Sequence, residues 1–189
     1  MQLILASSSP RRRDLLARIG IAPDRIASPD IDETPRKAEI ARIYALRMAV
    51  EKAHAVERIA GEIVIAGDTT VAVGRRILPQ AADADMQRGF LKLLSGRRHH
   101  VLSAVCVIDV GGTARSRISD SIVRFKRLSD AEIESYVASG EGLGKAGGYA
   151  IQGRAEALID WMAGSHSGVI GLPLYETRAL LRAAGYPVE

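Results

Sequence analysis

The sequence has little cysteine and no long hydrophobic run, and both shortages exclude classes of protein. Cys106 is the single cysteine among 189 residues, which rules out an internal disulfide and a cysteine-based zinc cluster and suits a reducing cytoplasm. No apolar run approaches the roughly 18 residues of a membrane-spanning helix. Because Met1 is followed by a short apolar run and then arginines, we expect no signal peptide, a cytoplasmic location and no membrane partner.

Aromatic residues are also scarce, at 4% of the chain. Proteins that hold nucleic acids usually combine stacking aromatic residues with a clustered basic stripe. Here the net charge of +4 comes from basic residues interleaved with acidic ones along the chain. This balance favours a small anionic ligand, and we expect no nucleic-acid partner.

The composition is otherwise that of a globular protein. Hydrophobic residues make up 47% of the chain and charged residues 25%. No repeat, low-complexity tract or linker interrupts the sequence, so we expect residues 1–189 to form a single domain. Strand and helix patterns alternate early, and paired strand patterns follow in the middle. This mixture predicts an α/β fold with a mixed central sheet flanked by helices.

The first candidate site is the opening of the chain, where an apolar strand pattern at 3–6 meets three serines and a helix pattern. Ser9 stands at the N-cap and Pro10 at the first helical position, where a missing N–H costs nothing. Free backbone N–H groups and the helix dipole favour a phosphate there. The arginines at 11–13 add donors that match phosphate oxygens. The alternative is an ordinary strand–helix unit with solvated arginines.

Asp68 is the second candidate. It follows the most strand-like run of the chain, residues 63–66, and precedes two threonines. Proteins of the α/β class often place their chemistry at the end of such a strand. The alternative is a plain turn aspartate in a hairpin.

Two further charged features are candidates for the same site. Prolines bracket the acidic segment 29–35, which predicts a loop that is either simply solvated or binds a hard cation through its carboxylates. A helix is predicted over 39–59. Its apolar stripe comprises Ile40, Tyr44, Met48, Ala55 and Ile59. Lys52 lies near that stripe, so its ammonium either snorkels to solvent or points into a cleft.

The second half of the chain alternates further elements with glycine-rich turns. The patterns predict helices over 83–94 and 129–139, antiparallel strands over 101–110 and 118–125, and a last helix from Pro173. His99 and His100 lack partners at ligand spacing, so we expect them at the surface. Five glycines between 140 and 148 predict a flexible loop, which leads into residues 149–153.

Four stretches together resemble the Maf family of nucleoside triphosphate pyrophosphatases, and the likeness spans nearly the whole chain. The stretches are 5–12 (LASSSPRR), 67–71 (GDTTV), 148–153 (GYAIQG) and 171–174 (GLPL). The resemblance implies a deep nucleotide-binding cleft in a Maf- and inosine triphosphatase-like fold, often as a homodimer. It also implies hydrolysis of non-standard or regulatory nucleoside triphosphates to the monophosphate and pyrophosphate, with a divalent metal (Mg²⁺, or alternatively Mn²⁺ or Co²⁺).

The same resemblance implies roles for individual residues. Asp68 matches the family's proton acceptor and Glu33 a carboxylate of the metal and phosphate region, so both are implied metal ligands. Lys52 matches a phosphate-facing lysine. The implied phosphate-binding residues of the opening are Ser7, Ser9, Arg11 and Arg12. The positions associated with substrate choice are Arg11, Thr69 and Gln152.

The form Ile-Gln-Gly at 151–153 resembles the branch of the family that acts on dTTP and UTP. The branch that acts on 7-methyl-GTP usually has Glu-Gly there. One position departs from the family, because Gln80 stands where a catalytic-site lysine is usual. Glutamine carries no charge, and losing a cation that faces a triphosphate can cost several kcal/mol of transition-state stabilisation.

The leading functional prediction is therefore a dTTP/UTP pyrophosphatase in which Asp68 orients and deprotonates a water that attacks the α-phosphorus. A 7-methyl-GTP pyrophosphatase is one alternative. A nucleotide-binding regulator of septum formation, with weak or no turnover, is another, and the missing lysine favours it. The resemblance leaves open whether the protein cleans the nucleotide pool, controls division or does both.

Overall fold

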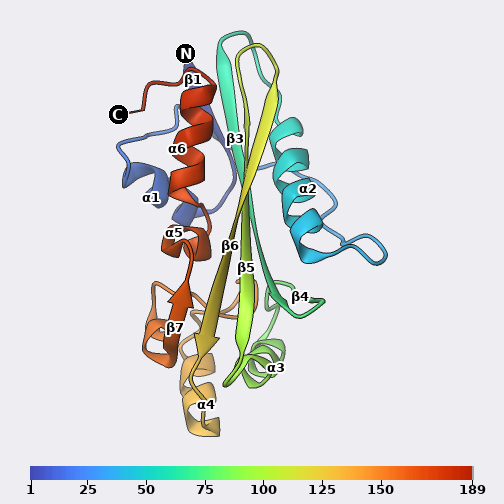
Figure 1. Cartoon of the computed structure of the whole chain (residues 1–189), viewed down its shortest axis with the longest axis vertical. Coiled ribbons are helices and arrows are strands. Elements are labelled where there is room, and N and C mark those ends of the chain that lie inside the picture. Colours follow the sequence, from blue (N-terminus) through green and yellow to red (C-terminus); the bar gives the residue numbers. More distant parts are fainter. Residues whose placement is uncertain (189) are drawn as a thin grey trace.

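The computed structural model describes residues 1–188 and has a mixed seven-stranded sheet at its centre. The strands follow the order β2-β1-β3-β5-β6-β7, and β4 pairs with β3 off this path (Figure 1). The strands are β1 (Gln2–Ala6), β2 (Arg25–Ala27), β3 (Glu62–Val73), β4 (Arg76–Leu78), β5 (Arg98–Ile108), β6 (Ala114–Phe125) and β7 (Ile159–Ala163). The helices are α1 (Pro10–Ala17), α2 (Ala41–His54), α3 (Ala84–Leu94), α4 (Asp130–Ala138), α5 (His166–Ile170), α6 (Leu174–Ala183) and the 3-10 helix η1 (Arg154–Leu158).

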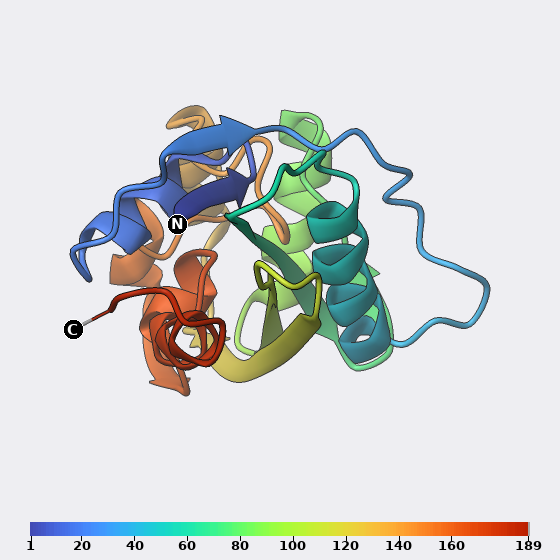
Figure 2. The ribbon, with the colours of Figure 1, turned by 90° about the horizontal axis from the view of Figure 1, so that it is seen from above.

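The sheet is parallel near one edge and antiparallel elsewhere. β1 pairs in parallel with both β2 and β3. From β3 onward, the pairs with β5, β6 and β7 are antiparallel. Figure 2 shows α2 and the C-terminal α6 on opposite sides of the long strands. The predicted mixed sheet flanked by helices is confirmed.

β3 has a gap in its strand pairing along one side. Its residues 62–66 pair with β1 and its residues 71–73 with β4, and between these ranges the described chain provides no strand partner on that side. On its other side β3 pairs with β5 without a break from Val64 to Ala72. Asp68 therefore lies inside a continuous strand, and the hairpin-turn alternative for it is wrong.

α2 covers one face of the sheet with small side chains. Its buried residues are Ala41, Ala45, Met48, Ala49, Lys52 and Ala53. The predicted range of 39–59 is too long. Of the predicted stripe only Met48 is buried; Tyr44 is half-buried, Ala55 is exposed, and Ile40 and Ile59 are 49% and 73% exposed. The small alanine side chains allow the helix to pack closely on the sheet. The face that contacts the sheet is therefore lined mostly by alanines, and not by the large apolar residues of the predicted stripe.

The predicted helix starts near 83 and 129 are confirmed. α4 begins with the capping box of Ser129 and Glu132, and Asp83 accepts the N–H of Met86 at the start of α3. α1 begins at Pro10 as predicted, but the side chain of Ser9 makes no capping hydrogen bond. The Ser9 hydroxyl is therefore not committed to the helix.

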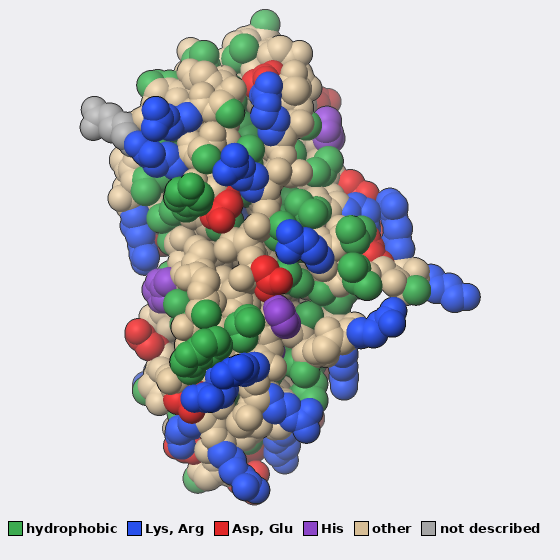
Figure 3. All heavy atoms as spheres, in the orientation of Figure 1, with side chains coloured by type: hydrophobic (Ala, Val, Ile, Leu, Met, Phe, Trp, Pro, Cys, Tyr) green, Lys and Arg blue, Asp and Glu red, His purple; other side chains and the backbone are tan. Residues whose placement is uncertain are grey.

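Charged side chains of both signs are spread over the face that Figure 3 shows, and the Lys and Arg side chains form several separate groups there. This distribution agrees with the interleaving of charges along the sequence. In residues 1–188, no helix combines the length and the apolar character that a membrane span requires.

His99 is buried, so its predicted place at the surface is wrong. Its ring is 1% exposed, stacks on Phe125 and lies with Nε2 2.7 Å from the hydroxyl oxygen of Tyr149. β5 begins at Arg98 rather than at 101, and strand alternation then turns His99 inward and His100 outward. His100 does have a carboxylate partner, because its Nδ1 lies 2.7 Å from Asp120 on β6.

Burial lowers the pKa of His99 to about 4. In the unfolded chain a histidine becomes protonated below about pH 6.5, whereas in the folded protein His99 stays neutral until about pH 4. The unfolded state therefore binds more protons between these pH values, and we expect the free energy of unfolding to fall by roughly 3 kcal/mol as the pH drops from about 6.5 to about 4. Urea unfolding of the wild type and of His99→Gln from pH 7.5 to 4 measures this. If both proteins lose stability with the same pH dependence, His99 is not responsible.

Candidate active site

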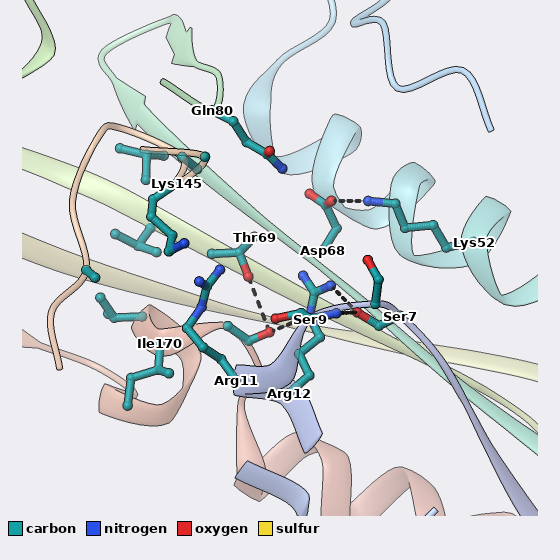
Figure 4. A pocket seen from close by; sticks show the side chains of 18 of the residues that line it. Ser7, Ser9, Arg11, Arg12, Lys52, Asp68, Thr69, Gln80, Lys145 and Ile170 are labelled. Atoms are coloured by element: carbon teal, nitrogen blue, oxygen red, sulfur yellow. Dashed lines mark hydrogen bonds and ion pairs between the residues drawn. The ribbon is translucent and has the colours of Figure 1, made fainter. Parts of the chain in front are cut away.

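A cavity of about 230 Å³ lies beside the open stretch of β3. Its walls come from segments that are far apart in the sequence: the serine turn and α1, the acidic loop, α2, β3, the loop after α4, and α5 (Figure 4). All ten site residues predicted from the sequence line this cavity. They are Ser7, Ser9, Arg11, Arg12, Glu33, Lys52, Asp68, Thr69, Gln80 and Gln152.

The serine turn is held in place by Arg12. The Arg12 side chain donates from Nη1 to Ser7 Oγ at 2.9 Å and from Nε to the carbonyl oxygen of Gly171 at 2.9 Å. Ser7 Oγ also accepts the backbone N–H of Ser9. Burial lowers the pKa of Arg12, and the nearby charge of Asp68 opposes this effect. Arg12 thus ties the turn to the segment before α6 and adds a half-buried positive charge to the cavity.

The other two arginines of this run differ in position. Arg11 is half-buried and lines the cavity. Arg13 is not among the lining residues, and its Nε lies 3.9 Å from Asp14 on the outer face of α1. The predicted anion seat therefore contains two of the three arginines, because successive helical residues point in different directions.

Lys52 joins the two carboxylates of the cavity. Its Nζ lies 2.9 Å from Asp68 Oδ1 and 2.8 Å from Glu33 Oε2. Thr70 donates from Oγ1 to the second oxygen of Asp68 at 3.0 Å. Both oxygens of this nearly buried aspartate therefore have partners, which holds the carboxylate in one orientation. Of the two alternatives for Lys52, the ammonium points into the cleft.

Glu33 reaches the cavity from a segment without regular secondary structure, as predicted for 29–35. α2 holds this loop: Tyr44 donates from its hydroxyl to the carbonyl oxygen of Glu33 at 2.8 Å, and Arg47 donates to that of Thr34 at 3.2 Å. Within residues 1–188, no group of three or more His, Cys, Asp or Glu side chains is arranged to hold a metal. Glu33 and Asp68 are the two carboxylates of the cavity that bind the same ammonium.

Thr69 and Gln152 lie on different walls of the cavity. Thr69 donates from Oγ1 to the carbonyl oxygen of Gly171 at 3.3 Å and accepts from Ser103 Oγ at 3.2 Å. The segment that carries Gln152 is anchored from behind, because the Tyr136 hydroxyl accepts the N–H of Ala150 at 3.0 Å. Gln80 points toward the Asp68 end of the cavity (Figure 4).

The family described as Maf-like protein matches residues 2–184. The chain belongs to the Maf family. It is 64% identical to a protein of Sphingopyxis alaskensis named dTTP/UTP pyrophosphatase, over 98% of each chain. It is 59% identical to a protein of Novosphingobium aromaticivorans with the same name, over 100% of this chain and 94% of the other. A solved structure titled nucleoside-triphosphatase / dITP/XTP pyrophosphatase, from Mycobacterium abscessus, covers 68% of this chain and 76% of its own at 20% identity, with a TM-score of 0.44.

Gln80, where the resemblance to the Maf family implies a lysine, lies at one wall of the cavity. Gln80 pairs with Ala146 in an isolated antiparallel bridge, so it is tied to the loop after α4. The two cations nearest to it in sequence are Arg75, on the turn after β3, and Arg76, the first residue of β4; both are exposed and neither lines the cavity. Neither of them replaces the charge that Gln80 lacks.

Sequence reasoning missed Lys145, which also lines the cavity of this Maf protein. The loop that carries it was predicted to be flexible, but its backbone is bonded to the segment after β4: Ala81 N–H donates to Lys145 O at 3.1 Å and Gly147 N–H to Pro79 O at 3.1 Å. A single lysine inside a glycine-rich run was the available signal. Local sequence did not indicate which part of the fold this loop would approach.

Proposed function

We propose that this protein is a nucleoside triphosphate pyrophosphatase that converts dTTP and UTP, or modified nucleotides, to the monophosphate and pyrophosphate. The observation that carries the proposal is the oriented, nearly buried Asp68, bound to Lys52 in a cavity bordered by a serine turn at a helix N-terminus. The names of the close relatives support the choice of dTTP and UTP.

In this proposal Asp68 receives a proton from the water that attacks the α-phosphorus. Lys52 and Thr70 hold the carboxylate in position, and a positioned base typically contributes about 10²–10⁴-fold to a rate. The buried charge of Lys52 and the half-buried charge of Arg12 counter the negative charge of the triphosphate. The hydroxyls of Ser7 and Ser9 and the backbone of their turn supply further donors to phosphate oxygens.

The carboxylates also fit a divalent metal. Mg²⁺ in nucleotide sites is usually held by one or two carboxylates together with substrate phosphates and water. Glu33 and Asp68 provide such a pair, and both already bind one cationic group, the ammonium of Lys52. We propose Mg²⁺ at these residues, with Mn²⁺ or Co²⁺ as alternatives. When bound, the metal would neutralise phosphate charge and lower the pKa of water.

The proposal is tested by pyrophosphate release from dTTP, UTP, CTP, GTP, ATP and 7-methyl-GTP, first with Mg²⁺ and then with a chelator. We expect metal-dependent release that favours dTTP and UTP. A preference for 7-methyl-GTP would assign the protein to the other branch. With water labelled by heavy oxygen, label in the monophosphate supports attack at the α-phosphorus, and label in the pyrophosphate excludes it.

Gln80 favours a second candidate function, a nucleotide-binding regulator of septum formation with weak or no turnover. The uncharged amide supplies no cation at the Asp68 end of the cavity. Nucleotide binding without release of pyrophosphate from any member of the panel would support this function over the first.

We expect Gln80→Lys to raise kcat about tenfold if the missing charge limits the reaction, which corresponds to about 1.4 kcal/mol of transition-state stabilisation. Steady-state kinetics with dTTP measure the change. Gln80→Met is the matched control, because it has a similar length and no charge. A rate for Gln80→Lys that equals or falls below the wild-type rate would mean that another group supplies this function.

The remaining expectations from the sequence stay proposals. We propose one domain over residues 1–189, a homodimer, a cytoplasmic location and no nucleic-acid or membrane partner. The nucleotide is the partner for which the cavity offers matching groups.

A further inference from the structure

Lys145 is brought to the cavity by a tightly constrained loop. Besides the hydrogen bonds to Pro79 and Ala81, the loop passes directly over β3: Gly147 has a φ of 69°, and a Cβ atom there would come within 2.8 Å of Val71 Cγ1. A side-chain-bearing residue at this position would push the loop away from β3. The position of Lys145 therefore follows from the fold and not from a free surface loop.

The cavity has two chemically different ends. In Figure 4, Asp68 and Lys52 lie at one end, whereas Lys145 and Arg11 extend toward each other at the other, beside Ile170. Asp68, Arg11 and Glu33 all influence the pKa of Arg12, whereas burial and Arg11 lower the pKa of Lys145. Arg11 is therefore within electrostatic reach of both ends, and Lys145 is affected by Arg11 alone among the charged residues.

The cavity also has apolar surface on which a nucleobase can pack. Its larger apolar lining residues are Val71, Val101, Tyr149, Val169 and Ile170, and Ile170 lies on the side of Lys145 and Arg11 (Figure 4). Small-molecule sites commonly combine such walls with a few polar groups that fix orientation. In this arrangement the phosphates lie at the opposite end, where Arg12 binds Ser7 of the serine turn and Lys52 binds Asp68, and Arg11 adjoins both the phosphates and the base.

Lys145 and Arg11 present hydrogen-bond donors and no acceptors to the base end. Lysine and arginine side chains donate hydrogen bonds and accept none. Within residues 1–188, Arg11 has no side-chain hydrogen bond or ion pair, and the one bond of Lys145 is a long one of 3.4 Å from Nζ to the carbonyl oxygen of Leu143. These donors therefore remain available to a ligand.

We propose that Lys145, together with Arg11, selects nucleobases that present keto oxygens, and so favours uracil and thymine over cytosine. The inference rests on the proposed function, because it assumes a nucleoside triphosphate in the cavity. Thymine and uracil accept at O4, whereas cytosine presents an amino donor at that position. Facing the cytosine amino group with Lys145 leaves donors on both sides unpaired, which disfavours binding. The side-chain oxygen of Gln152 can accept the N3–H of uracil or thymine, because an amide group both donates and accepts hydrogen bonds.

The test compares UTP with CTP, which have the same size and the same phosphates. We expect Lys145→Met to lower kcat/KM for UTP at least tenfold, mainly through KM, and to change kcat/KM for CTP less than threefold. Lys145→Arg, which keeps the donors, should retain the preference for UTP. Lys92→Met, on an exposed position of α3, is the control for loss of one positive charge.

An equal loss for UTP and CTP would overturn the inference and make Lys145 a phosphate ligand, and unchanged kinetics with both nucleotides would overturn it as well. Calorimetry with the α,β-imido analogues of dUTP and dCTP tests the same preference without turnover. If the wild type hydrolyses nothing, the proposed function fails, yet a preference for the dUTP analogue that disappears in Lys145→Met still supports the role of Lys145. Circular dichroism verifies folding, and Lys145→Gln replaces Lys145→Met if the latter is unfolded.

Discussion

Asp68→Asn is expected to lower kcat for dTTP by about 10²–10⁴-fold while the affinity for the nucleotide changes little. The amide oxygen of the new side chain can still accept from Lys52, so the strand and the cation should keep their positions. What the substitution removes is the basicity that takes a proton from water. Asp68→Asn therefore separates nucleotide binding from the chemical step.

Steady-state kinetics with dTTP and calorimetry with an α,β-imido analogue measure the two quantities independently. Asp120→Asn is the matched control, because Asp120 lies on β6 in an exposed pair with His100, away from the cavity residues. Turnover equal to the wild type in Asp68→Asn would remove Asp68 from its role. A large loss of affinity would instead make Asp68 chiefly a binding group.

Lys52→Met should reduce both stability and activity. The substitution leaves the carboxylate of Asp68, with a side chain 8% exposed, close to that of Glu33 with no ammonium between them. Removing one partner of a buried ion pair typically costs about 3–5 kcal/mol. Losing one preorganised charge that faces the reacting group typically lowers kcat by about 10²–10³-fold.

A double-mutant cycle identifies the origin of the stability loss. If the uncompensated charge of Asp68 is the cause, Lys52→Met combined with Asp68→Asn should be more stable than the sum of the single effects predicts, because the buried negative charge is gone. Urea unfolding at neutral pH measures all four proteins, and Lys52→Arg shows how much of the effect depends on charge alone. Strict additivity would argue that Lys52 acts through packing of its stem.

The prediction of the site residues has a limited physical basis. Ser7, Arg12, Asp68 and Gln152 were assigned by resemblance to the Maf family, in which the order and spacing of several stretches act together. The residue patterns alone left each position with an ordinary structural alternative. Only the fold shows that these separate stretches line one cavity.

Local chemistry in the sequence determined the features that depend on near neighbours. The capping box at Ser129 and the start of α1 at Pro10 both depend on residues within one helical turn, so the sequence alone predicted them. The mixed α/β class likewise followed from the order of strand and helix patterns.

The tertiary structure decided the features that depend on distant segments. β3 continues through Asp68 because β5 pairs with it along this stretch, and His99 is buried because β5 starts early and turns it toward Tyr149. Lys52 meets the two carboxylates because alanines bring α2 close to the sheet. Lys145 reaches Arg11 because a glycine loop packs on β3. In each case the partner lies far away in the sequence, and no local pattern contains that information.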